Sequence, residues 1–174
     1  MSEADDTGSG ARAGDAERGF TVVRVLNAPP ERVFQAWTEP DMLGWFYSGN
    51  GHVDEPIEVD PTVGGAWRQR MVIDEDTSYL TGGVYRELTP GQRIVFDWGA
   101  VDGWPELPVD AAARDAVDVP RVTVELVPLP GDRTELRLHQ ALPPHLTEEQ
   151  VAYWDGIDCH AGWSMTLDRL PGAL

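Results

Sequence analysis

Asp158 and Gln69 are polar residues whose spacing from apolar neighbours places them on faces predicted to line the interior, where they could bind or react with a ligand. Trp154, Asp158 and Met165 recur at helical spacing, so a helix there predicts a carboxylate on a face that lines the interior. A carboxylate enclosed in this way can serve as a general acid or base. The alternative, an exposed aspartate just beside that face, fits the spacing too and stays open.

Gln69 stands between Trp67 and Met71 in a segment that alternates apolar and polar residues. Because alternate side chains of a strand share a face, the three are predicted to point inward together. The amide of Gln69 would then offer a ligand one acceptor and two donors. An edge position near solvent is the alternative.

Metal-binding and nucleophile patterns are not found in the sequence. The histidines are scattered, none lies four residues from another, and they stand at His52, His139, His145 and His160. The single cysteine, Cys159, lies in helical sequence and is typical of a packed thiol. The sequence therefore predicts no metal and no cofactor, and it assigns no catalytic residue.

Aromatic residues are the strongest indication of a binding site. The chain has seven tryptophans, and a mostly apolar concave surface with a few polar groups is typical of small-molecule pockets. A filled core with only a small void is the alternative. We predict a hydrophobic cavity, on whose space Trp67, Phe96, Trp98 and Trp154 converge. The full predicted lining is Trp45, Phe46, Trp67, Gln69, Met71, Phe96, Trp98, Trp104, Trp154, Asp158 and Met165.

The elements that would position these side chains follow from periodicity and turn residues. Two short helices are predicted at 29–38 and 41–45, since prolines suit a first helical turn. A long helix from Thr147 to Leu170 opens with a capping box, and Gly162 within it indicates a close backbone approach. Alternation predicts an antiparallel sheet with one wet face. Its strands are expected at 20–26, 56–59, 66–73, 79–88, 92–98, 121–127 and 134–140.

The remaining segments lack periodicity. Residues 1–19 are small, charged and glycine-rich, which predicts a disordered tail before a single domain at 20–174. Residues 99–120 form a long acidic loop, which is either a lid over one mouth of the cavity or a plain insertion. As a lid, it would be anchored by Trp104.

The charge balance excludes two classes of partner. The chain has 30 acidic and 13 basic residues, a net charge of -17. Such a surface repels phosphate backbones and anionic lipid heads, so neither nucleic acid nor a membrane is an expected partner. A single cysteine and the lack of a long apolar run favour the cytoplasm. We expect a monomer or a homodimer.

Four stretches of the sequence resemble one family. Residues 25–40, VLNAPPERVFQAWTEP, resemble the opening signature of the activator-of-Hsp90-ATPase-homologue-like family, and residues 59–67, 83–98 and 160–170 are similar to its later landmarks. The resemblance implies the α+β helix-grip fold of the START-like superfamily. In that fold a curved antiparallel sheet wraps around a long C-terminal helix.

Three functions follow as hypotheses. The leading one is a non-enzymatic domain that binds an apolar or aromatic small molecule. The second is a cofactor-independent cyclase or dehydratase, in which Asp158, His139 or Gln69 would take part. The third, implied by the family's name, is a regulator of an Hsp90-type chaperone.

Overall fold

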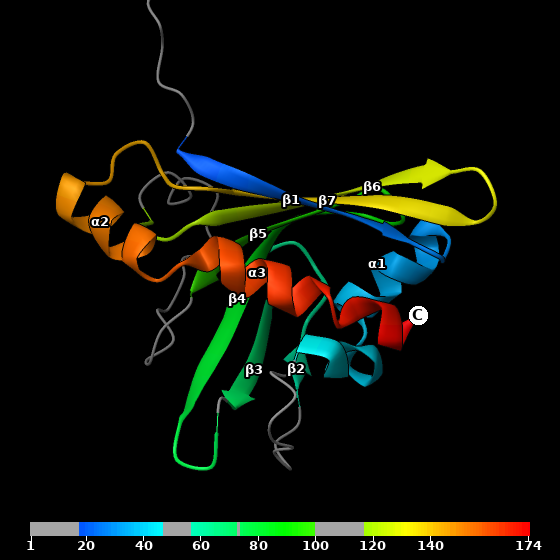
Figure 1. The fold of residues 1–174 in the computed structure, drawn as a ribbon, viewed down its shortest axis with the longest axis horizontal. Coiled ribbons are helices and arrows are strands. Elements are labelled where there is room, and N and C mark those ends of the chain that lie inside the picture. Colours follow the sequence, from blue (N-terminus) through cyan, green and yellow to red (C-terminus); the bar gives the residue numbers. More distant parts are fainter. Residues whose placement is uncertain (1–17, 47–56, 73, 100–116) are drawn as a thin grey trace, which may run out of the picture.

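The computed structural model describes residues 18–46, 57–72, 74–99 and 117–174. In these ranges seven strands form one antiparallel sheet in the order β1-β7-β6-β5-β4-β3-β2. Strands β2 to β7 form a meander, and β1 joins it beside β7 (Figure 1). The strands are β1 (Gly19–Leu26), β2 (Glu58–Val59), β3 (Ala66–Val72), β4 (Ser78–Thr89), β5 (Arg93–Gly99), β6 (Arg121–Leu129) and β7 (Arg133–Ala141).

Helices cover one face of this sheet. The helix α3 crosses that face, and α1 lies near its C-terminal end (Figure 1). The predicted α+β helix-grip architecture is therefore confirmed. The helical elements are α1 (Pro30–Thr38), η1 (Pro40–Phe46), α2 (Glu148–Gly156), α3 (Cys159–Leu167) and η3 (Leu170–Ala173).

The strand β3 shows how alternation builds the core. Trp67, Gln69 and Met71 are buried while Arg68, between them, is exposed. Gln69 pairs with Thr81 of β4, so their side chains lie next to each other on the inner face. The period-two pattern thus correctly predicts which residues of β3 point inward.

The outer face of the sheet carries a buried ion cluster. Asp97 alternates with the inward-facing Phe96 and is fully buried. Its carboxylate accepts hydrogen bonds from Arg86 Nε at 2.5 Å and from Arg121 Nε at 2.9 Å. A buried charge is tolerated only when it is paired in this way, so the three side chains connect β4, β5 and β6.

The long C-terminal helix is present but divided. Its start is as predicted, since Thr147 caps α2 and Gln150 completes the capping box. Ile157 and Asp158 interrupt the segment, and Asp158 has a left-handed backbone with φ of 53°. The Asp158 side chain then caps α3 by accepting a hydrogen bond from the Ala161 amide at 3.2 Å. The prediction of one uninterrupted helix therefore missed a second N-cap.

The interpretation of Gly162 is wrong. A Cβ built on Gly162 would meet no atom within 4 Å, because the residue lies on an exposed part of α3. Close approach occurs instead at Gly83 of β4, where a Cβ would lie 2.7 Å from the Asp97 carbonyl oxygen and 2.8 Å from the Trp67 ring. Gly83 is required because an indole and a neighbouring strand both press on its backbone.

The predicted tail and loop lie mostly outside the described residues. Residues 1–17 and 100–116, including Trp104, are not described. The tail, the lid and the anchoring role of Trp104 therefore stay predictions. The described end of the loop is packed: Val117 and Val119 are buried, and the Trp98 amide donates to the Pro120 carbonyl at 2.9 Å.

Candidate functional site

An apolar cleft opens between the C-terminal helices and the β3–β4–β5 side of the sheet. Its volume is about 440 Å³, which lies within the range of small-molecule sites, about 300–1,000 Å³. The lining residues come from η1, β3, β4, β5, α2, α3 and the turn before β4. They are Phe46, Met71, Thr77, Ser78, Tyr79, Thr81, Trp98, Tyr153, Ile157, Cys159, Gly162, Trp163 and Thr166.

The polar groups of this cleft are neutral. Among the described lining residues there is no aspartate, glutamate, arginine or histidine, and the polar side-chain groups are hydroxyls, two indole N–H groups, one thioether and one thiol. Trp98 Nε1 donates to Thr81 Oγ1 at 3.0 Å, which holds the indole against the cleft wall. Burial raises the pKa of the Tyr79 hydroxyl and that of the Cys159 thiol above their usual values. Both groups are therefore protonated at neutral pH.

An amide without partners lies beneath the floor of the cleft. Gln69 is 2% exposed, and within the described residues neither its Oε1 nor its Nε2 has a hydrogen-bond partner. Met71, next on the same face of β3, and Thr81, directly opposite, both line the cleft. The Trp67 indole N–H, on the other side of Gln69, is also buried and unpartnered among the residues described. The inward position predicted for Gln69 is correct, and it is not at a wet edge.

The interior behind the cleft is packed rather than hollow. Trp67 and Phe96 meet edge to face with ring centroids 5.2 Å apart. Trp163 contacts both Phe96, at 6.3 Å, and Trp98, at 5.3 Å. A void of only about 10 Å³ remains, bordered in part by Trp67 and Phe96. The predicted aromatic residues do converge, but they fill the space that was expected to hold the ligand.

The eleven predicted lining residues fall into different places. Phe46, Met71 and Trp98 line the cleft. Trp45 belongs to the packed core, where its Nε1 donates to the Ala36 carbonyl at 2.8 Å. Trp67 and Phe96 are core residues as well, and Gln69 lies between core and cleft.

The prediction that Trp154, Asp158 and Met165 share one inward face is wrong for Asp158 and Met165. Met165 is 64% exposed and does not line the cleft, because the break at Ile157–Asp158 turns α3 relative to α2. Asp158 is exposed and caps a helix, so the alternative reading of this residue is correct. Trp154 contacts Trp98 with ring centroids 6.2 Å apart but lines a different cleft.

Sequence reasoning missed several lining residues. Trp163 lies within the predicted C-terminal helix, but it is not among the eleven residues predicted to line the cavity. Tyr79 and Thr81 pair with Met71 and Gln69 across the β3–β4 hairpin, so the register of that hairpin would have identified them. Gly162 lines the cleft because it has no side chain to fill it.

A model of the family described as Activator of Hsp90 ATPase homolog 1-like protein matches residues 27–174. The chain belongs to this family. A crystal structure of a Chromobacterium violaceum protein is 29% identical, with a TM-score of 0.63, and the match covers 88% of this chain and 94% of that one. A Nitrosomonas europaea protein is 25% identical, with a TM-score of 0.69, over 92% and 96% of the two chains.

A third similar structure is that of an Hsp90 activator from Plasmodium falciparum, which is 24% identical to this chain with a TM-score of 0.50. The match covers 75% of this chain and 77% of that one. At this identity the likeness shows the fold alone. The search of curated proteins gives no significant match. These comparisons confirm the predicted family of the chain.

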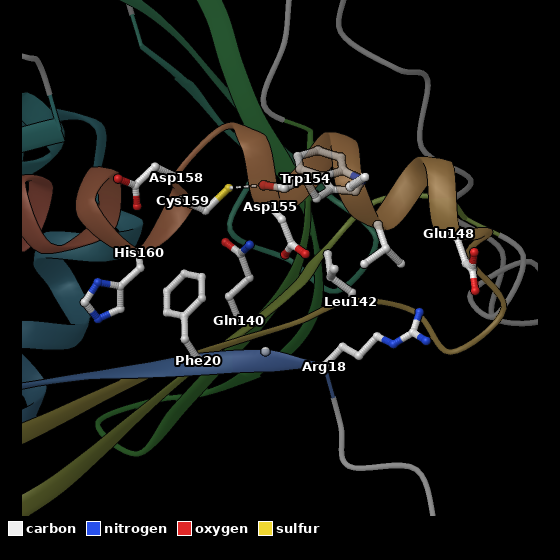
Figure 2. Close-up of a pocket in the computed structure, with 13 residues that line it drawn as sticks. Arg18, Phe20, Gln140, Leu142, Glu148, Trp154, Asp155, Asp158, Cys159 and His160 are labelled. Atoms are coloured by element: carbon white, nitrogen blue, oxygen red, sulfur yellow. Dashed lines mark hydrogen bonds between the residues drawn. The ribbon is translucent and has the colours of Figure 1, made fainter.

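This family member has a second, more polar cleft between α2 and the ends of β1 and β7 (Figure 2). Its volume is about 580 Å³, and its wall includes Glu148, Asp155 and Asp158. Trp154 and Cys159 also border it, and Cys159 Sγ lies 3.9 Å from the Trp154 carbonyl oxygen. Cys159 thus lies between the two clefts, with its thiol buried.

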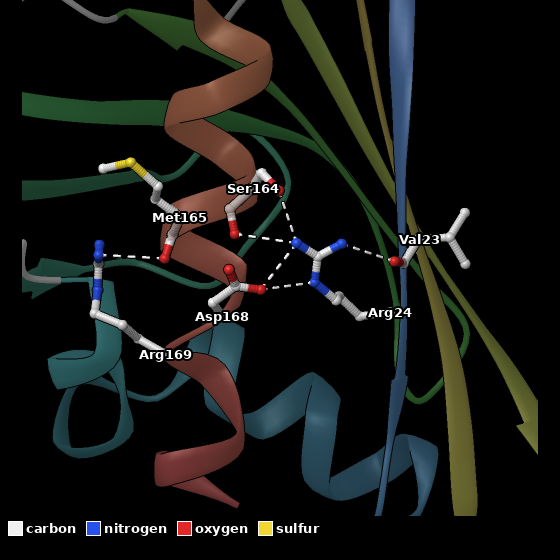
Figure 3. A network of polar contacts seen from close by, with 6 residues as sticks. All are labelled: Val23, Arg24, Ser164, Met165, Asp168 and Arg169. Carbon is white, nitrogen blue, oxygen red and sulfur yellow. Dashed lines mark hydrogen bonds and ion pairs between the residues drawn. The ribbon is translucent and has the colours of Figure 1, made fainter.

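Two arginines fix α3 in place. Arg24 of β1 reaches Asp168 Oδ1 at 2.9 Å and Ser164 Oγ at 2.7 Å (Figure 3). Arg169 donates to the Trp45 carbonyl at 2.9 Å and to the Met165 carbonyl at 3.3 Å. Because η1 and β1 are both tied to the C-terminal end of α3, that end of the cleft has a fixed wall.

Two further features concern metal ions and membranes within residues 18–46, 57–72, 74–99 and 117–174. No group of three or more histidine, cysteine, aspartate or glutamate side chains there is arranged to hold a metal ion. No helix in those ranges is both long enough and apolar enough to span a bilayer.

Proposed function

We propose that this protein binds a neutral apolar or aromatic small molecule in the cleft between the C-terminal helices and β3–β5. The observation that carries the proposal is the composition of the cleft wall: two indoles, Trp98 and Trp163, surrounded by apolar side chains and neutral hydroxyls. Aromatic and apolar walls with a few placed polar groups favour this class of ligand. Membership in a START-like family is consistent with the same role.

Binding is better supported than catalysis. The titratable side chains among the described lining residues are Tyr79, Tyr153 and Cys159. General base catalysis near neutral pH needs a group that is deprotonated there, whereas burial raises the pKa of Tyr79 and of Cys159. A cyclase or dehydratase therefore has less support. Regulation of an Hsp90-type chaperone rests on the family description alone.

Gly162 offers a direct test. A leucine at this position would extend into the cleft, and its Cβ would clash with nothing. With the neutral fluorophore N-phenyl-1-naphthylamine as probe, we expect Gly162→Leu to weaken binding at least about tenfold, or about 1.4 kcal/mol. The measurement is a titration that follows probe emission and the quenching of tryptophan emission.

Gly156 provides the matched control. It is an exposed helical glycine with open space around it, and it does not line the cleft. Gly156→Leu should leave the dissociation constant of the probe within about twofold, well under the 1.4 kcal/mol of a tenfold change. Equal affinities in the wild type and both variants, or no binding of the probe by the wild type, would refute the proposal.

We also propose a cytoplasmic monomer or homodimer. The single free thiol, Cys159, supports a reducing compartment. Val23 and Val25 are 47% and 54% exposed on β1, at the edge of the sheet, which suits an edge-to-edge pair. Light scattering at physiological salt tests the assembly, and a tetramer or larger species would contradict it.

A further inference from the structure

Gln69 is a buried residue, 2% exposed, whose polar side-chain atoms have no partner among the described residues. Buried amides are nearly always hydrogen-bonded, since an unpaired one loses its water without compensation. An exception of this kind requires an explanation.

The position of Gln69 supplies one. Met71 and Thr81 flank it on the inner face of the sheet, and both line the apolar cleft. Thr81 Oγ1 accepts a hydrogen bond from Trp98 Nε1, and neither polar atom of Gln69 is bonded to the threonine or to any other described residue. Met71 is unbranched and has three rotatable torsions, so a change of its rotamer can open a path from the cleft to the amide.

We propose that Gln69 selects ligands that carry a neutral cis-amide or lactam group on an aromatic body. This inference rests on the proposed function. The carboxamide of Gln69 presents a carbonyl oxygen and an N–H side by side. A cis-amide presents the complementary pair, so the two groups form a closed ring of two hydrogen bonds. The Trp67 N–H, also unpartnered in the described ranges, is a further donor nearby.

Charged head groups are disfavoured at this position. No described residue of the cleft wall carries a formal charge at neutral pH, and Arg68, next to Gln69 in sequence, points to the other face of the sheet. A carboxylate or an ammonium buried beside Gln69 would therefore lack a counter-ion in the cleft wall. A neutral cis-amide satisfies both atoms of Gln69 without burying a charge.

The test compares two probes of the same shape, 2-quinolinone and naphthalene, by displacement of N-phenyl-1-naphthylamine. The variants are Gln69→Leu and the unbranched Gln69→Met, so that a packing fault in one does not decide the result. In both variants the ratio of dissociation constants, 2-quinolinone over naphthalene, should rise at least about tenfold over the wild type. Comparing this ratio between each variant and the wild type cancels the difference in hydrophobicity between the two probes.

The probe-free protein gives a second readout. Replacing an unpartnered buried amide with an apolar side chain of similar size removes a desolvation cost, so both variants should melt at a higher temperature than the wild type. A lower melting temperature in both would show that the amide has a partner and would overturn the proposal. An unchanged ratio while both probes bind would also overturn it and leave the binding function standing. If neither probe binds, the proposed function is wrong and this inference with it.

Discussion

Gly83→Ala is expected to destabilise the protein, because three fixed groups surround the site. The new Cβ would lie 2.7 Å from the Asp97 carbonyl oxygen, 2.8 Å from the Trp67 ring and 3.0 Å from the Phe96 ring. The carbonyl belongs to the β4–β5 ladder, and the Phe96 ring is held by Trp67 at 5.2 Å. None of these groups can move without disturbing the strand pairing or the packed rings. Overpacking of this kind costs about 1–3 kcal/mol, which exceeds the smaller gain from removing a glycine from a strand, about 0.5–1 kcal/mol.

Gly162→Ala is the comparison that isolates packing from chain entropy. The same chemical change at this position meets open space within an α-helix, so it should stabilise the protein by up to about 1 kcal/mol. The two variants are therefore predicted to shift stability in opposite directions.

Urea denaturation followed by tryptophan emission measures both effects on one scale. For a chain of this length 1 kcal/mol corresponds to about 2–4 °C in melting temperature, so a thermal scan serves as a second readout. A Gly83→Ala variant as stable as the wild type would refute the close contact at β4. Destabilisation by Gly162→Ala would restore the rejected view that the backbone of α3 is closely approached there.

Two further predictions concern buried polar groups. Asp97→Asn should lower the free energy of unfolding by about 3–5 kcal/mol, since it leaves buried arginine charge uncompensated. Glu125→Gln, at a half-exposed ion pair, should lower it by at most about 1 kcal/mol. Equal losses of the two variants in urea denaturation would contradict this prediction. Burial raises the pKa of Cys159 above the value of an unfolded thiol, about 8.5, so its stabilising contribution is fully present below that pH and is lost as pH rises through the folded pKa. Unfolding measured from pH 7 to pH 10 should therefore lose stability more steeply in the wild type than in Cys159→Ala, and parallel curves would refute the assignment.

Elements with strong local signals were predictable from the sequence. The alternation around Gln69 gave the inner face of β3, and Thr147 with Gln150 marked the start of α2. These signals depend on neighbours within a few residues, so they survive without knowledge of the rest of the fold. The family landmarks then supplied the order of strands that local patterns leave open.

The contents of the interior were not predictable in the same way. Periodicity indicates that Trp67, Phe96 and Trp98 face inward, but it does not indicate how closely the rings pack. Trp163 decides the matter, because it contacts both Phe96 and Trp98 and takes up the space between the sheet and α3. A break of two residues at Ile157–Asp158 further sets which side chains of α3 reach the sheet, and a helical repeat drawn through it places Met165 on the wrong side.

Two residues that lower the stability of the fold without structural compensation, Gly162 and Gln69, lie at the same cleft. Gly162 weakens α3 by about 1 kcal/mol relative to alanine, although nothing in the described structure approaches it closely enough to require a glycine. Gln69 holds a buried amide without partners among the described residues. The first lines the apolar cleft, and the second lies beneath its floor. Local costs without structural compensation are expected at functional sites. Both residues belong to or adjoin the same cleft, and this coincidence supports the proposed binding site there.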